Sequence, residues 1–187
     1  MNKQIIFKFT DSSIYFYNCL TNEMIIENIK GYKVIEKGKI TDVEKLLAIL
    51  EDTIIKNKLF NLLLKTKIYI LIPSFYNKTD YFLLTYIFKS LNYYNYEFIE
   101  EKSLYKNLLK SDTVVINLWD NFGEISSIQN NKIDSIPYTT ESINNIYEKN
   151  IIIINNTSHK KINLKDKNIY YIEPKKYYLI EELKKQI

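Results

Sequence analysis

The chain has 187 residues, 46% of them hydrophobic and 26% charged, which is typical of a globular protein and excludes a disordered one. Its single cysteine, Cys19, excludes a disulfide framework, and a single histidine, His159, excludes a zinc site made only of cysteine and histidine. The net charge of +4 rests on 26 basic residues that are all lysine, and the lack of arginine, which grips phosphates and guanine edges, argues against a nucleic-acid binder.

Targeting signals are not visible in the sequence. Residues 1–10 lack the apolar run and small-residue cleavage site of a signal peptide. The most apolar stretch, 81–88, is far shorter than the ~20 residues that cross a membrane. The sequence therefore predicts a cytoplasmic protein with no transmembrane segment.

The first third of the chain is expected to form a hairpin-rich sheet and then one long helix. A tight polar turn at 10–12 separates two segments rich in β-branched and aromatic residues, which predicts a hairpin. Thr41 and Glu44 have capping-box spacing, so a helix should begin at Thr41, and apolar residues at helical spacing extend it to about Leu64. The strands predicted in this part are 4–9, 13–18, 23–27 and 32–35.

The remaining segments alternate strands with helices. A strand over 67–72 stops at Pro73, and Thr79 and Asp80 can cap the helix that follows. A second hairpin is predicted around the turn 120–123. The other predicted strands are 96–100, 112–118, 124–129, 132–136, 150–155 and 168–173. The other predicted helices are 79–93, 102–110, 139–148 and 176–186.

This alternation predicts an α/β fold with mixed β-sheets flanked by helices. The second hairpin, which begins at Asp112, is expected to start another sheet. We therefore expect two parts, residues 1–111 and 112–187, packed together without a flexible linker.

The order of segments over residues 4–130 resembles the actin-like ATPase superfamily, and bacterial MreB and FtsA in particular. Lys39-Ile40-Thr41-Asp42 is similar to the Gly-Val-Ile-Ala-Asp segment of MreB, and residues 69–74 (Tyr-Ile-Leu-Ile-Pro-Ser) are similar to its Val-Val-Gly-Val-Pro segment. Residues 98–101 (Phe-Ile-Glu-Glu) resemble its Leu-Ile-Glu-Glu. The second hairpin falls where MreB has its Val-Asp-Ile-Gly-Gly-Gly-Thr hairpin. The resemblance implies an actin-like (RNase H-like) core.

Two hairpins hold the nucleotide in this family. Glycines let backbone N–H groups approach the phosphates, and an aspartate holds Mg²⁺ through water. Lys8 occupies the place that aligns with the first aspartate, and the stretch from Thr10 to Ser13, with Asp11 and Ser12 between them, replaces the Gly-Thr stretch. A lysine at that place does not bind a metal.

The second hairpin departs from the family in the same way. Asn117 replaces the aspartate, and Trp119, Asp120, Asn121 and Phe122 replace the glycine run, while Gly123 survives. The glutamate that orients the attacking water in MreB would correspond to Glu100 or Glu101. One retained carboxylate without a metal site or a phosphate cradle implies that ATP is not hydrolysed.

Length is a further departure, because a full MreB-like chain has four subdomains. Too few residues separate the first hairpins from Lys39, or follow Ile136, to form the two small upper subdomains. The resemblance therefore implies a core that lacks both of them. Since these subdomains close over the nucleotide base, their loss also argues against ATP binding.

Two further features have competing interpretations. His159 lies in a polar loop after an apolar strand, where open α/β sheets bind ligands, yet a lone loop histidine is usually idle. The clustered tyrosines could fill the core or could form a protein interface, where tyrosine is enriched. The interface candidates are Tyr93, Tyr94, Tyr96, Tyr170 and Tyr177.

Two functions are expected from these observations. The first is a non-catalytic actin-like scaffold or protein-interaction module in a cytoskeletal, cell-division or secretion assembly, with protein partners or self-association and no cofactor or metal. The second is a small α/β ligand-binding protein or enzyme whose loop site would use His159, Glu100, Asp120 and Lys8.

Overall fold

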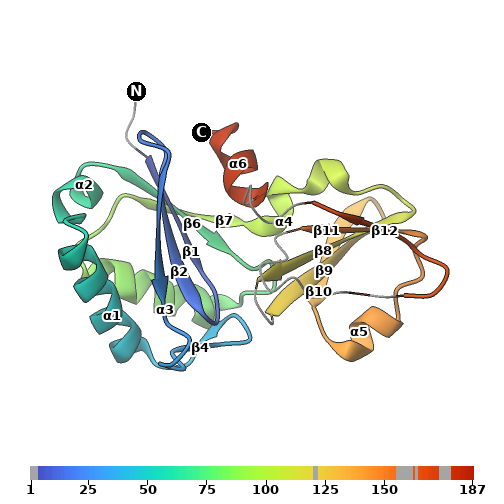
Figure 1. Cartoon of the computed structure of the whole chain (residues 1–187), viewed down its shortest axis with the longest axis horizontal. Coiled ribbons are helices and arrows are strands. Elements are labelled where there is room, and N and C mark those ends of the chain that lie inside the picture. Colours follow the sequence, from blue (N-terminus) through green and yellow to red (C-terminus); the bar gives the residue numbers. More distant parts are fainter. Residues whose placement is uncertain (1–3, 120–121, 155–161, 163, 173–177) are drawn as a thin grey trace. The chain divides into compact units, whose positions relative to one another are not determined.

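The structure is a computed structural model that describes residues 4–119, 122–154, 162, 164–172 and 178–187 (Figure 1). These residues fall into two units. The first comprises Met1–Ile72 and Tyr76–Ile99, and the second comprises Pro73–Phe75 and Glu100–Ile187. Each unit contains a five-stranded sheet in the described residues. A division into domains at 1–111 and 112–187 stays a prediction.

The sheet of the first unit has the strand order β3-β2-β1-β6-β7. β2 is antiparallel to both β1 and β3, whereas β6 is parallel to β1, so the sheet is mixed. Its strands are β1 (Gln4–Phe9), β2 (Ser13–Asn18), β3 (Glu23–Asn28), β6 (Lys67–Ile72) and β7 (Tyr96–Glu100). A two-stranded sheet of β4 (Ile35–Glu36) and β5 (Lys39–Ile40) follows β3.

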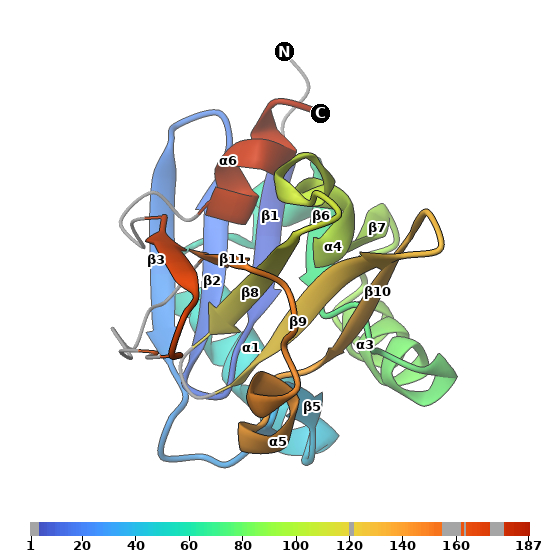
Figure 2. The same cartoon turned by 90° about the vertical axis from the view of Figure 1, so that its right-hand side faces the viewer.

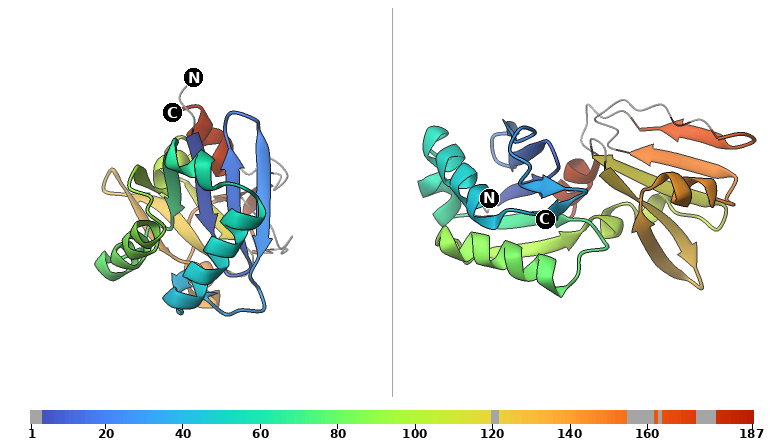
Figure 3. Two further views of the ribbon diagram at one scale, coloured as in Figure 1. Left: turned by 90° about the vertical axis from the view of Figure 1, so that its left-hand side faces the viewer. Right: turned by 90° about the horizontal axis from the view of Figure 1, so that it is seen from below.

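Helices α1 (Val43–Lys56) and α3 (Lys78–Ser90) cover one face of this sheet, as Figure 3 shows, and α2 (Phe60–Leu64) lies between α1 and β6 in the chain. Alternate residues of each strand point to the same face. Phe7 of β1 therefore reaches the helical layer, where it packs against Phe88 of α3 at a ring-centroid distance of 5.3 Å. Leu46 and Leu50 of α1 complete this fully buried core.

The helix starts differ from the capping predictions. Asp42, not Thr41, caps α1 and accepts from the N–H of Lys45 at 3.0 Å. Asn77 caps α3 and forms a capping box with Asp80. The cap of α1 lies one residue after the predicted Thr41, and the cap of α3 lies two residues before the predicted Thr79. In each case a carboxylate or amide oxygen, and not a threonine hydroxyl, accepts from the free N–H groups at the start of the helix.

The prediction of one long helix that extends to about Leu64 was wrong. α1 ends at Lys56, and Lys58 has a φ of 55°, in the left-handed region that breaks a right-handed helix. A separate short helix, α2, then begins at Phe60. The apolar pattern is continuous across this break, which is why spacing alone joined the two helices.

The sheet of the second unit has the order β10-β9-β8-β11-β12, and Figure 2 shows its first three strands side by side. β9 is antiparallel to β8 and β10, and β11 is parallel to β8 and β12. The strands are β8 (Thr113–Trp119), β9 (Phe122–Gln129), β10 (Lys132–Pro137), β11 (Asn150–Ile154) and β12 (Asn168–Tyr171). The helices are α4 (Glu101–Leu104), the 3-10 turn η1 (Lys106–Leu108), α5 (Thr140–Asn144) and α6 (Tyr178–Lys184).

The two five-stranded sheets therefore share one topology: a three-stranded meander whose first strand is flanked by a parallel strand. Lys8 and Asn117 occupy the same place in it, since each is the fifth residue of the first strand. Lys8 lies opposite Tyr15 and Leu71, and Asn117 lies opposite Glu124 and Ile154. The alignment of both residues to the aspartates of the actin-like hairpins stays a prediction.

Candidate functional site

The second hairpin carries buried polar side chains on one face. Val115, Asn117 and Trp119 alternate along β8 with the apolar residues of the opposite face, and Asn117 and Trp119 are 0% and 1% exposed. Glu101 of α4 lies against them and is also 1% exposed. Its carboxylate accepts hydrogen bonds from Asn117 Nδ2 and, at 3.2 Å, from Trp119 Nε1. A buried carboxylate is thus satisfied by two neutral donors of the hairpin.

The two neighbouring glutamates have different surroundings. Glu100 ends β7, is partly exposed and forms an ion pair of 3.0 Å with Lys102. Glu101 begins α4 and is the one placed against the hairpin. Of the two residues that the sequence left open for the water-orienting glutamate, Glu101 is the one that accepts a hydrogen bond from Asn117. Its role in water orientation stays a prediction.

Gly123 is required by a close approach of backbone to backbone. It lies opposite Leu118 in the hairpin ladder. A Cβ at this position would overlap the backbone oxygen of Asn117 and would lie 2.8 Å from Leu118 Cδ2. The surviving glycine therefore has a packing reason in this chain that needs no bound phosphate. Asp120, in the turn of the same hairpin, lies outside the described residues.

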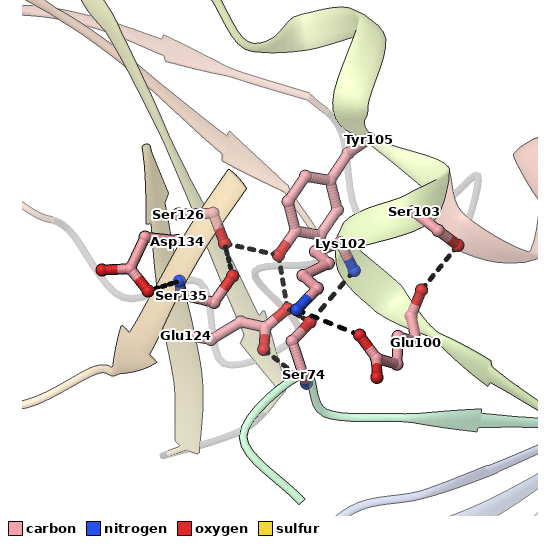
Figure 4. Close-up of polar contacts among 9 residues, drawn as sticks. All are labelled: Ser74, Glu100, Lys102, Ser103, Tyr105, Glu124, Ser126, Asp134 and Ser135. Carbon is pink, nitrogen blue, oxygen red and sulfur yellow. Dashed lines mark hydrogen bonds and ion pairs between the residues drawn. The ribbon is translucent and has the colours of Figure 1, made fainter. Parts of the chain in front are cut away.

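A second buried carboxylate, Glu124 of β9, is the centre of a larger network (Figure 4). It is 1% exposed and accepts from the N–H and hydroxyl of Ser74 at 2.8 and 3.1 Å and from the hydroxyl of Tyr105. The Tyr105 oxygen also lies 2.8 Å from Ser126 Oγ, which lies 2.6 Å from Ser135 Oγ. The network links the loop after β6 to strands β9 and β10 and to Tyr105, the residue that follows α4.

Burial and the adjacent Glu124 carboxylate raise the pKa of Tyr105 well above its usual range, because both disfavour the phenolate. Tyr105 therefore stays a hydrogen-bond donor to Glu124. This network was not predicted from the sequence. The available signal was the alternation along β9. Glu124 and Ser126 are two residues apart, so their side chains point to the same face of the sheet, which is the face that carries Asn117.

The first hairpin is closed by its own side chains. Thr10 Oγ1 accepts from Ser13 N at 3.0 Å, and Ser12 Oγ lies 3.4 Å from Ser13 Oγ. The Asp11 carboxylate accepts from the N–H groups of Lys37 and Gly38, at 2.9 and 2.7 Å. Both of these residues have a positive φ, so their N–H groups point together into an anion-binding nest. Asp11 itself occupies that nest.

Lys8 lies beside this turn on β1 and is 1% exposed. Its position in the middle of the sheet follows from its pairing with Tyr15 and Leu71, both of which are buried. Lys8 is therefore an interior lysine, and its alignment with a metal-binding aspartate stays a prediction.

The tyrosine candidates do not share one environment. Tyr93 is 2% exposed in the core of the first unit, and Tyr96 packs beside Phe88 there, at 5.5 Å between ring centroids. Tyr94 is 68% exposed, and Tyr170, on β12 of the second unit, is 56% exposed. Tyr177 and His159 lie outside the described residues. The interface role of these tyrosines stays a prediction.

Within the described ranges, His, Cys, Asp and Glu side chains do not gather in any group of three or more that could hold a metal ion. A search of the same residues for a helix long and apolar enough to cross a membrane found none. The buried carboxylates of Glu101 and Glu124 accept hydrogen bonds from protein donors.

Comparisons with known proteins were made by sequence and by structure. No family model matches the sequence, and no curated protein matches it. Solved structures do match. MreB5 of Spiroplasma citri bound to ADP superposes with a TM-score of 0.54 at 13% identity, over 74% of this chain and 52% of that chain. The same protein bound to AMPPNP gives a TM-score of 0.52 at 14% identity, over 73% and 52%.

A third match is the ethanolamine utilization protein EutJ from Carboxydothermus hydrogenoformans. Its TM-score is 0.52 at 13% identity, over 75% of this chain and 53% of that chain. The fold is therefore that of the actin-like ATPases, with two mixed sheets flanked by helices, and the predicted fold class is confirmed. The chain spans about half the length of the structures that it matches.

Proposed function

We propose that this protein is an actin-like interaction module that neither binds nor hydrolyses ATP. The observation that carries the proposal is the satisfied carboxylate of Glu101, which accepts from Asn117 and Trp119 inside the second unit. A general base or water-orienting group must reach a water molecule, whereas this carboxylate is 1% exposed. Freeing it would break the hydrogen bonds that it accepts from two buried donors, which costs free energy.

The first hairpin supports the same proposal through charge. A phosphate cradle offers backbone N–H groups to an anion. Here Asp11 places a negative charge at the turn and already takes the N–H groups of Lys37 and Gly38. An incoming phosphate would meet a carboxylate and would have to displace it, which like-charge repulsion disfavours.

The shortened architecture is also part of the proposal. The chain spans 52% of the MreB5 structure, and we attribute the difference to the two small upper subdomains that cover the nucleotide in the family. A core without a nucleotide switch retains sheet and helix surfaces for binding proteins. We therefore propose protein partners, with self-association as one form, in a cytoskeletal, cell-division or secretion assembly.

Thermal unfolding with and without millimolar Mg-ATP tests the loss of nucleotide binding. A ligand at about 100 times its Kd adds about 2.7 kcal/mol of stability, which raises the Tm of a chain of this size by roughly 5–10 °C. We expect no rise beyond that given by Mg-tripolyphosphate, which controls for ionic effects on a lysine-rich surface. A rise that requires both magnesium and the adenine nucleotide would overturn the proposal.

Sedimentation velocity across a wide range of protein concentration tests self-association. A single sedimentation coefficient that does not depend on concentration would assign the interaction surface to other proteins. Release of phosphate from ATP, measured in parallel, would contradict the non-catalytic role if the rate exceeded that of a sample unfolded by heat.

A further inference from the structure

The second unit contains a small cavity on the face of its sheet that is opposite the Glu124 network. The cavity has a volume of about 160 Å³ and lies between β9, β10 and the segment around the end of α5. Its floor is apolar: Val114, Ile125 and Ile146 are 0%, 5% and 8% exposed. A cavity of about 150 Å³ with apolar walls holds one benzene molecule in another protein, so this one admits roughly six non-hydrogen atoms.

The register of β9 and β10 places a carboxylate at the edge of this apolar floor. Ile136 lies opposite Ile125, and Asp134 lies opposite Ser127, two residues further along each strand and therefore on the same face. Ser135, between them, points to the other face and joins Ser126. Figure 4 shows the Asp134 carboxylate directed away from Glu124 and Tyr105.

A second carboxylate, that of Glu148, lines the cavity from the segment after α5. The bonds that these two acids form are local: Asp134 accepts from the N–H of Ser135 at 3.0 Å, and Glu148 accepts from the N–H of Tyr147 at 3.2 Å. Neither forms an ion pair with any lysine in the described part of the chain, although lysines supply all 26 basic residues. Among the described residues that line the cavity, two are acids and none is a base.

We propose that this cavity binds a lysine side chain presented by a partner protein. The four methylene groups of lysine would lie on the apolar floor, and the ammonium group would reach Asp134 and Glu148 at the rim. Tyr147, which lines the same cavity and is 87% exposed, is available to stack on the cation. The apolar stem and the single positive charge of lysine match the apolar side chains and the two carboxylates that line the cavity.

This inference extends the proposed function. It rests on that function in one respect, which is that the ligand is part of a protein partner. The cavity lies on the opposite face of the second sheet, and its lining includes none of the residues on which the nucleotide argument rests: Glu101, Asn117, Trp119 and Asp11. Failure of lysine to bind would therefore leave the Mg-ATP result untouched, and nucleotide binding would leave the lysine result untouched. The two proposals can fail separately.

The test is a titration of the ¹⁵N-labelled full chain, followed by NMR, with Nα-acetyl-lysine-N-methylamide as the probe. We expect saturable shifts of the amides of Val114, Ile125 and Ile146. The matching norleucine amide, which has the same stem without the charge, should bind at least about tenfold more weakly, since a charged hydrogen bond is lost. Equal shifts with both probes, or no saturable shift with lysine, would overturn the inference.

Variants of the two acids test whether their carboxylates bind the ammonium group of lysine. The double variant Asp134→Asn/Glu148→Gln keeps the shape of both side chains and should weaken lysine binding about tenfold or more. Glu141→Gln removes an exposed carboxylate of α5 that does not line the cavity, and it should leave binding unchanged. Binding that resists the double variant would contradict the inference. Concentration-dependent self-association that the double variant abolishes would instead assign the lysine to a second copy of this chain and refute a separate partner.

Discussion

Ser74 and Glu124 are 50 positions apart in the chain, yet the Glu124 carboxylate takes both the backbone N–H and the hydroxyl of Ser74. This pair fixes the loop that follows β6 to strand β9. With Tyr105 as a third donor, the carboxylate has three neutral partners and is 1% exposed. A buried charge is stable in a protein only with such partners.

The substitution Glu124→Gln should therefore destabilise the chain, although it preserves shape. An amide presents a donor where the carboxylate presents an acceptor, so at least one of the Ser74 and Tyr105 bonds is lost. We expect a loss of about 1–3 kcal/mol in the free energy of unfolding, measured by urea denaturation. Hydrogen exchange of the Ser74 amide should accelerate more than that of Ile70 in β6. An unchanged Ser74 exchange rate would show that Glu124 does not hold this loop.

Gly123 and Gly31 form a matched pair for a substitution to alanine. At Gly123 the new methyl group would overlap the Asn117 backbone, so we expect a loss of about 1–3 kcal/mol or more, or a failure to fold. At Gly31 nothing lies within 4 Å of the added carbon, and alanine should be neutral or stabilising by up to about 1 kcal/mol. Thermal unfolding of the two variants measures the difference. Equal stability would mean that the hairpin adapts to the methyl group.

Asp11 should be needed for the order of the β4–β5 turn. The variant Asp11→Ala removes both acceptors of the Lys37 and Gly38 amides, and because the turn is partly exposed, water can replace them at a cost of about 0.5–1.5 kcal/mol. The exchange rates of these two amides should rise severalfold in NMR. Asp52→Asn, at an exposed position of α1, serves as the control and should change neither rate.

Alkaline pH should lower the stability of the protein, because the fold raises the pKa of two tyrosines. Burial raises the pKa of Tyr105, and burial with the charge of Glu182 raises the pKa of Tyr178 to about 12, above the ordinary value of 10.0. Below pH 10 both states hold these protons. Above it the unfolded state releases them first, so stability falls as pH rises. The fall is about 1.4 kcal/mol per pH unit for the proton of the buried Tyr105, and it is smaller for the partly exposed Tyr178, which solvent screens.

The variant Tyr105→Phe tests this dependence. It should be less stable at pH 7, because Glu124 loses a donor, but its stability should fall less steeply above pH 10. The measurement is urea unfolding from pH 7 to 11, with tyrosinate absorbance as a second readout. A slope equal to that of the unaltered chain would show that Tyr105 does not contribute.

The strands were largely predictable, because β-branched and aromatic runs between polar turns have few other stable conformations. The hairpin over residues 4–18 was placed correctly for this reason. The end of α1 was not predictable. It depends on a lysine, Lys58, in a left-handed conformation, and the neighbouring apolar spacing gives no sign of it.

The buried carboxylates were the hardest features to predict. Acidic residues are rarely buried, so the sequence alone gives no reason to expect the burial of Glu101 and Glu124. Their burial depends on donors that come from distant segments, such as Ser74 for Glu124. Alternation along β8 and β9 indicated the face on which Glu124 lies, but only the folded chain supplies the partners that stabilise it there.

The pairing of Ser74 with Glu124 also has a consequence for the order in which the chain matures during its synthesis. Ser74 leaves the ribosome 50 residues before its acceptor, and at about 5–20 residues per second this is a wait of roughly 3–10 s. During that time β6, which precedes residues 73–75, can already pair with β1 and β7 in the first sheet, while the Ser74 amide must bond to water. The nascent chain therefore passes through a stage in which the first sheet is complete and one of its loops is still exposed to proteases and chaperones.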